Sequence, residues 1–231
     1  MHHHEEKHFE SPDFVRDIVI GMADGLTVPF ALAAGLSGAV DTSGIILTAG
    51  IAEIAAGSIA MGLGGYLAGK TEVDHYEAEL KREYTETETF PEKEKEEVRE
   101  VLEEYGVSET SSKLIAEEMS KDKEKWVKFM MRFELGLEKP DAKRASRSAF
   151  NIGIAYIVGG LVPLSPYIFI HDSREALLIS VAVTLIALFV FGFLKAKAIG
   201  QNTWQGAVKT TLIGALAAGA AFLLASLIGA H

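Results

Sequence analysis

The sequence predicts an all-α membrane protein, with five transmembrane helices and an acidic three-helix domain inserted between the second and the third. Two observations support this fold class. The chain of 231 residues combines a mean hydropathy of +0.19 with a formal net charge of −10, which is unusual for a soluble domain. The charges are also segregated, because residues 72–141 hold 22 acidic and 12 basic side chains and the rest of the chain holds 10 of each. The flanking regions are therefore apolar enough to enter a membrane.

Two apolar segments lie in the first 70 residues, after a short N-terminal tail. They are residues 14–37 and 44–69, and each is longer than the roughly 20 residues that span a bilayer core. A turn at residues 41–43 joins them, so we expect an antiparallel helical hairpin. The first segment is too long and too interrupted for a signal peptide, and no basic leader precedes it, so it should stay in the mature protein.

Three further apolar segments follow the acidic region. Residues 176–194 and 210–230 carry no charge, and each has the length of a transmembrane helix. Residues 152–170 form the remaining span, in which Pro163 and Pro166 should kink or end the helix near the far surface. The predicted regions are a tail at 1–13, helices 1 and 2 at 14–70, the inserted domain at 71–142, and helices 3 to 5 at 143–231.

Basic residues beside the spans predict the orientation, since cytoplasmic loops are enriched in lysine and arginine. With five spans, the short loops on one side hold only Arg174. The other side holds the remaining basic residues that flank the spans, which are Lys70, Lys143, Arg144, Arg147, Lys195, Lys197 and Lys209. We therefore expect the N-terminus and the acidic domain to face the cytosol, and the C-terminus to lie across the membrane.

The insert at 71–142 has the pattern of amphipathic helices with surfaces rich in glutamate and lysine. Helix breakers lie at Phe90–Pro91, at Gly106 and at residues 138–140, so we expect three or more helices between them. Most of the glutamates should belong to a solvated helical surface. The chain has no cysteine, which excludes disulfides and thiolate zinc sites.

The first predicted span carries a carboxylate near its middle. An acidic side chain at that depth costs on the order of 2.5–3.5 kcal/mol, so Asp24 is a candidate functional residue. Asp13 and Asp17 lie within about 40° of the same helix face, although either one can equally serve as a first-turn cap. Pro29 should bend the helix close to Asp24, either as a moving hinge or as a static kink.

The second span carries Glu53, Gly57 and Met61 at intervals of four residues, so a carboxylate and a thioether share one helix face across a glycine. A lone methionine in a membrane helix usually packs against lipid or protein. Its association with two acidic residues makes Met61 a candidate ligand. Oxygen ligands with one soft sulfur favour Fe²⁺ or another late first-row ion over Mg²⁺ or Ca²⁺.

Glutamate and methionine also recur in the insert at spacings of three and four residues, which place them on one face of a helix. Carboxylates in this arrangement build multi-metal sites in helical bundles. With so many glutamates the same spacing also arises by chance on a solvated surface, and spacing alone leaves both interpretations open. The candidate metal ligands are Glu83, Glu86, Glu94, Glu97, Met130, Met131 and Glu134.

Three long motifs resemble the vacuolar iron transporters of plants, and the match covers nearly the whole chain. They are RDIVIGMADGLTVPFALAAGLSGA at 16–39, IAEIAAGSIAMGLGGYLAGKTEVDHY at 51–76 and FMMRFELGLEKPD at 129–141. The resemblance implies a homodimer of five-helix subunits, with the ion path between the two copies of the first span. The stretch at 85–112 is more charged than the family's pattern, which leaves the affinity and ion count of the inserted domain open.

The resemblance also implies roles for individual residues. By position it assigns Asp24, Glu53 and Met61 to the translocation path, and Asp13 and Asp17 to its cytosolic mouth. It assigns the seven candidate ligands of the insert to a cytosolic metal-binding domain. Its implied activity is Fe²⁺/H⁺ exchange across the vacuolar membrane.

The predicted function is therefore a cation/proton antiporter and not an enzyme. It would move Fe²⁺ from the cytosol into the vacuole, with Mn²⁺ or another divalent transition metal as the alternative ion and Zn²⁺ and Co²⁺ as surrogates. No prosthetic group and no nucleic acid are expected, and the partners are the lipid bilayer, protons, metal ions and a second copy of the chain.

Two rival functions follow from the same residues. A carboxylate-bundle iron oxidase requires paired Glu-x-x-His motifs, and the insert has a single histidine, His75. A membrane-anchored metal buffer or sensor would leave the acidic residues of the spans costly and without purpose.

Overall fold

The structure is a computed structural model that describes residues 12–229, so most of the predicted tail at 1–13 lies outside the described residues. All the regular elements of the described chain are helices, and an isolated bridge between Thr42 and Asp172 is its only β pairing. The elements are α1 (Pro12–Ser37), α2 (Ser43–Thr89), α3 (Pro91–Glu104), α4 (Glu109–Met119), α5 (Lys123–Phe129), η1 (Met130–Glu134), α6 (Arg144–Phe169), α7 (Ser173–Ala198) and α8 (Thr203–Gly229).

The prediction of five membrane spans is confirmed, because five helices are long and apolar enough to cross a bilayer: α1, α2, α6, α7 and α8. Two of them begin earlier than hydropathy indicates. α6 begins at Arg144 where the apolar segment begins at residue 152, and α8 begins at Thr203 where it begins at residue 210. The added residues mix basic, polar and apolar side chains and contain no proline, so the backbone stays helical beyond the apolar stretch.

The second helix continues without a break past the predicted end of its span at Gly69. α2 has 47 residues and ends only at Thr89. Between Lys70 and Phe90 the chain contains neither glycine nor proline, and its most frequent residue is glutamate, which favours helix. The composition therefore changes from apolar to charged while the backbone hydrogen bonds of the helix continue.

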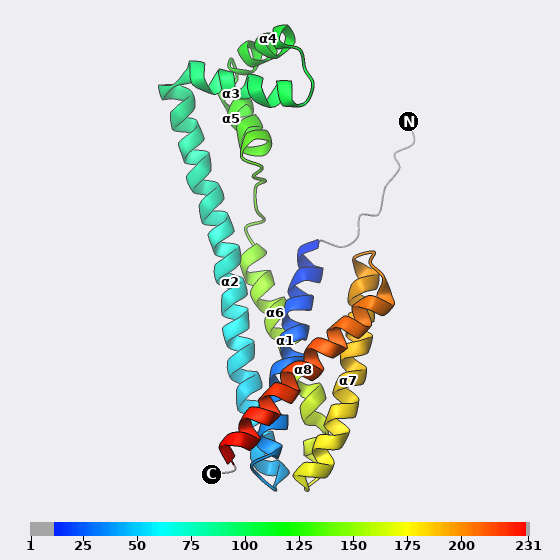
Figure 1. Cartoon of the computed structure of the whole chain (residues 1–231). Coiled ribbons are helices and arrows are strands. Elements are labelled where there is room, and N and C mark those ends of the chain that lie inside the picture. The colour runs from blue at the N-terminus through cyan, green and yellow to red at the C-terminus, as the bar shows by residue number, and fades with distance from the viewer. Residues whose placement is uncertain (1–11, 230–231) are drawn as a thin grey trace, which may run out of the picture. The chain divides into compact units, whose positions relative to one another are not determined.

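The chain divides into two compact units. The first comprises residues 12–66 and 145–229, and the second comprises residues 67–144. In the first unit α7 and α8 lie side by side, and both contact α1 (Figure 1). Its main core is formed by the buried side chains Ala33, Ile46, Ile54, Leu164, Tyr167 and Ala176. These residues come from α1, α2, α6 and α7, so four of the five spans share one core.

Helices α1 and α6 cross at two glycines that are four residues apart. A Cβ atom on Gly21 would lie 2.3 Å from the Ile152 carbonyl oxygen, and one on Gly25 would lie 2.4 Å from the Tyr156 carbonyl oxygen. No side chain fits in that space, so the two backbones touch directly. Small residues at this spacing are a common means of close helix packing in membranes, where apolar burial contributes little.

The helix of the third span does not end at its prolines. Pro163 and Pro166 both lie inside α6, which continues to Phe169. Pro166 has no N–H to donate to the Val162 carbonyl, and the Ser165 hydroxyl donates to that carbonyl at 2.8 Å instead. This local replacement explains why the helix continues for three residues beyond Pro166.

The two helical hairpins of the first unit are joined by backbone hydrogen bonds where their turns meet. The Ser43 N–H donates to the His171 carbonyl at 3.1 Å, and the Ser173 N–H donates to the Asp41 carbonyl at 3.3 Å. The Ser173 hydroxyl donates to the Val40 carbonyl at 2.7 Å. The α1–α2 turn, predicted at residues 41–43, is therefore paired with the α6–α7 turn.

The second unit packs α3, α4, α5 and η1 around a small apolar core. The buried members of that core are Val98, Ala116, Trp126 and Met130. Helix ends fall at the predicted breaks, since α2 ends at Thr89 and α3 ends at Glu104. A further break between α4 and α5 was not predicted, and the Asp122 carboxylate caps the start of α5 there by accepting from the Lys125 N–H.

The α1–α6 crossing gives a test of the fold. Gly21→Ala should lower the free energy of unfolding by about 1–3 kcal/mol, because the added methyl group would overlap the Ile152 carbonyl oxygen. Gly219→Ala in α8 is the matched control, since its added Cβ meets no atom within 4 Å. Thermal unfolding of the purified protein in detergent measures both. Equal melting temperatures for the two variants would contradict the close crossing.

Candidate metal-binding and translocation sites

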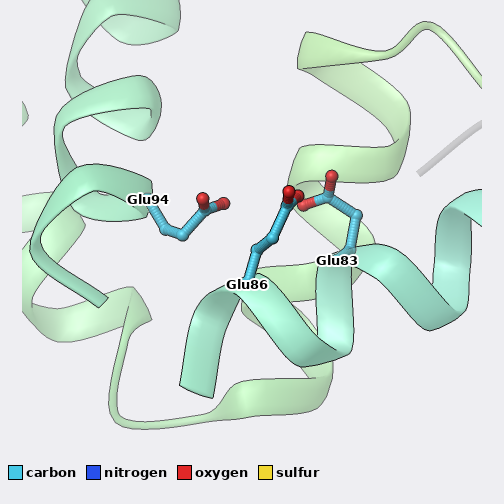
Figure 2. Close-up of side chains that lie close together, drawn as sticks. All are labelled: Glu83, Glu86 and Glu94. Carbon is cyan, nitrogen blue, oxygen red and sulfur yellow. The ribbon is translucent and has the colours of Figure 1, made fainter. Parts of the chain in front are cut away.

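Three glutamates of the second unit converge on one point. Glu83 and Glu86 come from the last turns of α2, and Glu94 comes from the first turn of α3. Figure 2 shows their carboxylates pointing toward one another across the α2–α3 connection. One oxygen of each lies within 4.8 Å of the others, which is a spacing that a single cation can bridge. The sharp turn at Pro91 brings the two helices together, so adjacent segments of the chain build the cluster.

Burial distinguishes this cluster from the solvated glutamates around it. Glu83 is 2% exposed and Glu94 is 1% exposed. Within the described residues, Oε2 of each carboxylate is buried and has no hydrogen-bond partner. A buried oxygen without a partner loses its hydration and gains no compensating hydrogen bond, which for a charged group costs several kcal/mol. Two such oxygens in one cluster indicate a site for a cation.

The electrostatics of the cluster extend to two more of the predicted ligands. Burial raises the pKa of Glu94 to about 7, and the charges of Glu97, Glu83 and Glu86 add to the effect. Burial also raises the pKa of Glu134 to about 7, with further contributions from Glu97 and Glu83. The pKa of each of these carboxylates therefore depends on the charges of the others, and near neutral pH the cluster carries fewer negative charges than it has carboxylates.

Met130 and Met131 lie in the π-helical turn η1 and are both buried. Met130 packs against Val98 and Trp126 in the apolar core. π-Helical turns are rare and occur often at functional sites. The sequence predicted neither this turn nor the part that Met130 has in the core.

Two basic side chains neutralise acidic groups of this region. Lys93 Nζ lies 2.7 Å from Glu97 Oε1. Arg82 lies 2.7 Å from Glu79 Oε2 through Nη2, and 3.4 Å from Glu86 Oε2 through Nε. A metal ion that binds Glu86 and Glu97 must therefore compete with these ammonium and guanidinium groups.

The first unit holds the predicted path residues Asp24, Glu53 and Met61, all of which are half-buried. Asp24 comes from α1, and the other two come from α2, eight residues apart. Among the described residues, no hydrogen bond or ion pair to the Asp24 carboxylate is found. Its position near the middle of an apolar helix leaves it available for an ion or a proton.

Glu53 is held by a residue that sequence reasoning missed. The Tyr156 hydroxyl of α6 donates to Glu53 Oε1, while Glu53 Oε2 is buried and has no partner within the described residues. A single tyrosine in an apolar span belongs to no recurring pattern, so nothing in the sequence marks Tyr156 as a partner of Glu53.

Asp13 and Asp17 were predicted on the Asp24 face of α1. Asp17 is 1% exposed and accepts hydrogen bonds from Ser148 Oγ at 3.0 Å and from Asn151 Nδ2 at 3.4 Å, both on α6. Asp13 is half-exposed, and its Oδ1 lies 3.9 Å from Arg16 Nη1. The Asp17 carboxylate is therefore part of the α1–α6 contact, which helical spacing alone does not predict.

Comparison with known proteins agrees with this architecture. The model of the VIT family matches residues 15–226. The chain is 54% identical to "Vacuolar iron transporter 1" of Arabidopsis thaliana over 228 residues, which cover 99% of this chain and 91% of that protein. It is 38% identical to "Protein CCC1" of Saccharomyces cerevisiae over 227 residues, which cover 94% of this chain and 70% of the yeast protein. The chain belongs to the VIT family.

Proposed function

We propose that the protein transports Fe²⁺ out of the cytosol into the vacuole in exchange for protons. The observation that supports this most directly is the pair of carboxylates, Asp24 and Glu53, inside two membrane spans. Carboxylates at that depth are costly unless they bind ions or protons. The names of the relatives support iron as the ion and the vacuole as the destination.

In the proposed route, the cation is first collected by the second unit, which faces the cytosol. A cluster with more carboxylates than it can ionise near neutral pH attracts divalent cations and gives up protons when one binds. Methionine sulfur among oxygen ligands favours a late first-row metal over Mg²⁺ or Ca²⁺. The proposed ligands are Glu83, Glu86, Glu94, Glu97, Met130, Met131 and Glu134.

The cation then enters the membrane along α1. Asp13 and Asp17 form the proposed mouth of the path, and Asp24, Glu53 and Met61 form the proposed site within it. Two chains would contribute to this path as a homodimer, with the copies of α1 facing each other. A carboxylate oxygen that binds a cation cannot hold a proton at the same time, so the same groups can carry either ion in opposite directions.

Removal of the Asp24 charge tests transport. In proteoliposomes with an imposed pH gradient, Asp24→Asn should lower Fe²⁺ uptake by on the order of a hundredfold or more, since a unit charge about 4 Å from an ion contributes about 4 kcal/mol at an effective dielectric constant of 20. Asp74→Asn is the control, because Asp74 is an exposed partner of Lys70. No uptake by the unmodified protein would favour a metal buffer, and normal uptake by Asp24→Asn would exclude this residue from the path.

The competing ammonium group gives a test of the acidic cluster. Lys93→Gln should tighten Zn²⁺ binding by about two- to fivefold, because the Glu97 carboxylate loses a competing partner at the surface. Lys95→Gln is the matched control two residues away, since Lys95 pairs with Glu92 and Glu117 outside the cluster. Isothermal titration of the full-length protein in detergent measures both affinities. Equal changes would mean diffuse attraction and no defined site.

The pKa values of about 7 for Glu94 and Glu134 predict how metal binding depends on pH. Above pH 7 both groups are ionised and free to bind a cation, and below it each must first lose a proton. Metal affinity should therefore fall by about tenfold for each group per pH unit below 7. Titrations with Zn²⁺ at pH 8, 7 and 6, with proton release measured in buffers of different ionisation enthalpy, check this. An affinity that stays constant from pH 8 to pH 6 would contradict it.

While a rise in pH strengthens metal binding by Glu94 and Glu134, it lowers their contribution to the stability of the metal-free protein. Because their pKa values are higher in the folded state than in the unfolded state, their contribution to stability is complete below about pH 4.5 and is lost as the pH rises through 7. Bound metal should therefore stabilise the protein most above pH 7, where the uncompensated negative charge is largest.

A further inference from the structure

We propose that Tyr156 is a positioning residue of the translocation path, which holds the Glu53 carboxylate so that one oxygen is left to bind the ion. This inference rests on the proposed transport function and adds a residue from a third helix to the path. The Tyr156 hydroxyl donates to Glu53 Oε1. Glu53 Oε2 is buried and has no partner among the described residues, so it is the atom that remains free for a ligand.

The position of the Tyr156 side chain is fixed by its surroundings. Tyr156 is 2% exposed. A Cβ atom on Gly57 of α2 would lie 2.4 Å from the hydroxyl oxygen, and one on Gly25 of α1 would lie 2.4 Å from the Tyr156 carbonyl oxygen. The absence of side chains at these two positions makes the space that the tyrosine occupies. The ring therefore has little freedom, and its hydroxyl can restrain the longer and more flexible Glu53 side chain.

The hydrogen bond affects what Glu53 can do as a ligand. With Oε1 engaged by the phenol, the carboxylate presents Oε2 alone, in a fixed direction. Because the hydrogen bond orders the flexible Glu53 side chain before the ion arrives, binding does not carry that cost in conformational entropy, and without the hydroxyl the cost returns on binding.

A second buried tyrosine on the same helix provides a comparison. Tyr167 is 3% exposed, and its hydroxyl lies 2.9 Å from Ser37 Oγ. Both tyrosines are buried, and the hydroxyl of each has a polar partner on a neighbouring helix. They differ in that Tyr156 contacts a carboxylate and Tyr167 contacts a neutral hydroxyl. Only the Tyr156 hydroxyl can therefore direct an acidic ligand, and the loss of either hydroxyl should have a similar effect on packing.

The test is Fe²⁺ uptake by the full-length protein in proteoliposomes, with rates corrected for the amount of folded protein. Tyr156→Phe should raise KM about three- to tenfold with little change in Vmax, because the Glu53 side chain must then become ordered as the ion binds. Tyr167→Phe should leave KM within about twofold of the unmodified protein. An unchanged KM for Tyr156→Phe, or an equal rise for both variants, would overturn the positioning role.

Two further outcomes are distinguishable. If Tyr156→Phe fails to fold, Glu53→Asp takes its place, since the shorter side chain keeps the charge and no longer reaches the hydroxyl. It should raise KM in the same way, and an unchanged KM would overturn the inference. If the unmodified protein shows no uptake, the proposed function fails, whereas active unmodified protein with an equally active Tyr156→Phe variant refutes the inference alone.

Discussion

The structure depends on the cost of placing carboxylates away from water. Glu53, Glu83 and Glu94 each have a buried oxygen without a hydrogen-bond partner in the described part of the chain. In an apolar protein such oxygens would be replaced during evolution by groups that need no partner, because each one reduces stability. Their presence in both units, in the membrane helices and in the acidic region, is the feature that the proposed transport function explains.

The two units bear this cost in different ways. In the second unit the carboxylates lie close to one another, and the pKa of about 7 for Glu94 and for Glu134 means that protons take the place of a cation when no metal is bound. In the first unit Glu53 and Asp24 lie on separate helices, and a neutral hydroxyl from Tyr156 contacts one of them. The glutamate cluster of the second unit suits the collection of cations near neutral pH, and the separate carboxylates of the first unit suit a single ion in transit.

Much of this organisation follows from sequence because hydropathy and helix breakers act locally. The five spans and the ends of α2 and α3 were predicted, since apolar length decides the spans, Pro91 decides the end of α2 and Gly106 decides the end of α3. The continuity of α2 and the place of Met130 in the apolar core were not predicted. Both depend on packing, which decides whether a helix continues and which of its faces joins the core. The spacing of Glu83, Glu86 and Glu94 predicted which faces they share, and only the structure brings the faces together.

The paired turns of the first unit limit how this part of the chain can move. Backbone hydrogen bonds join the α1–α2 turn to the α6–α7 turn through Ser43 and Ser173. Any motion that keeps these bonds must pivot about the turns, so displacement of the hairpins grows with distance from them. Asp17, on the contact between α1 and α6, lies near the opposite end of α1. The hydrogen bonds that Asp17 accepts from Ser148 and Asn151 lie where such a motion would separate α1 and α6 furthest, so these bonds oppose it most directly.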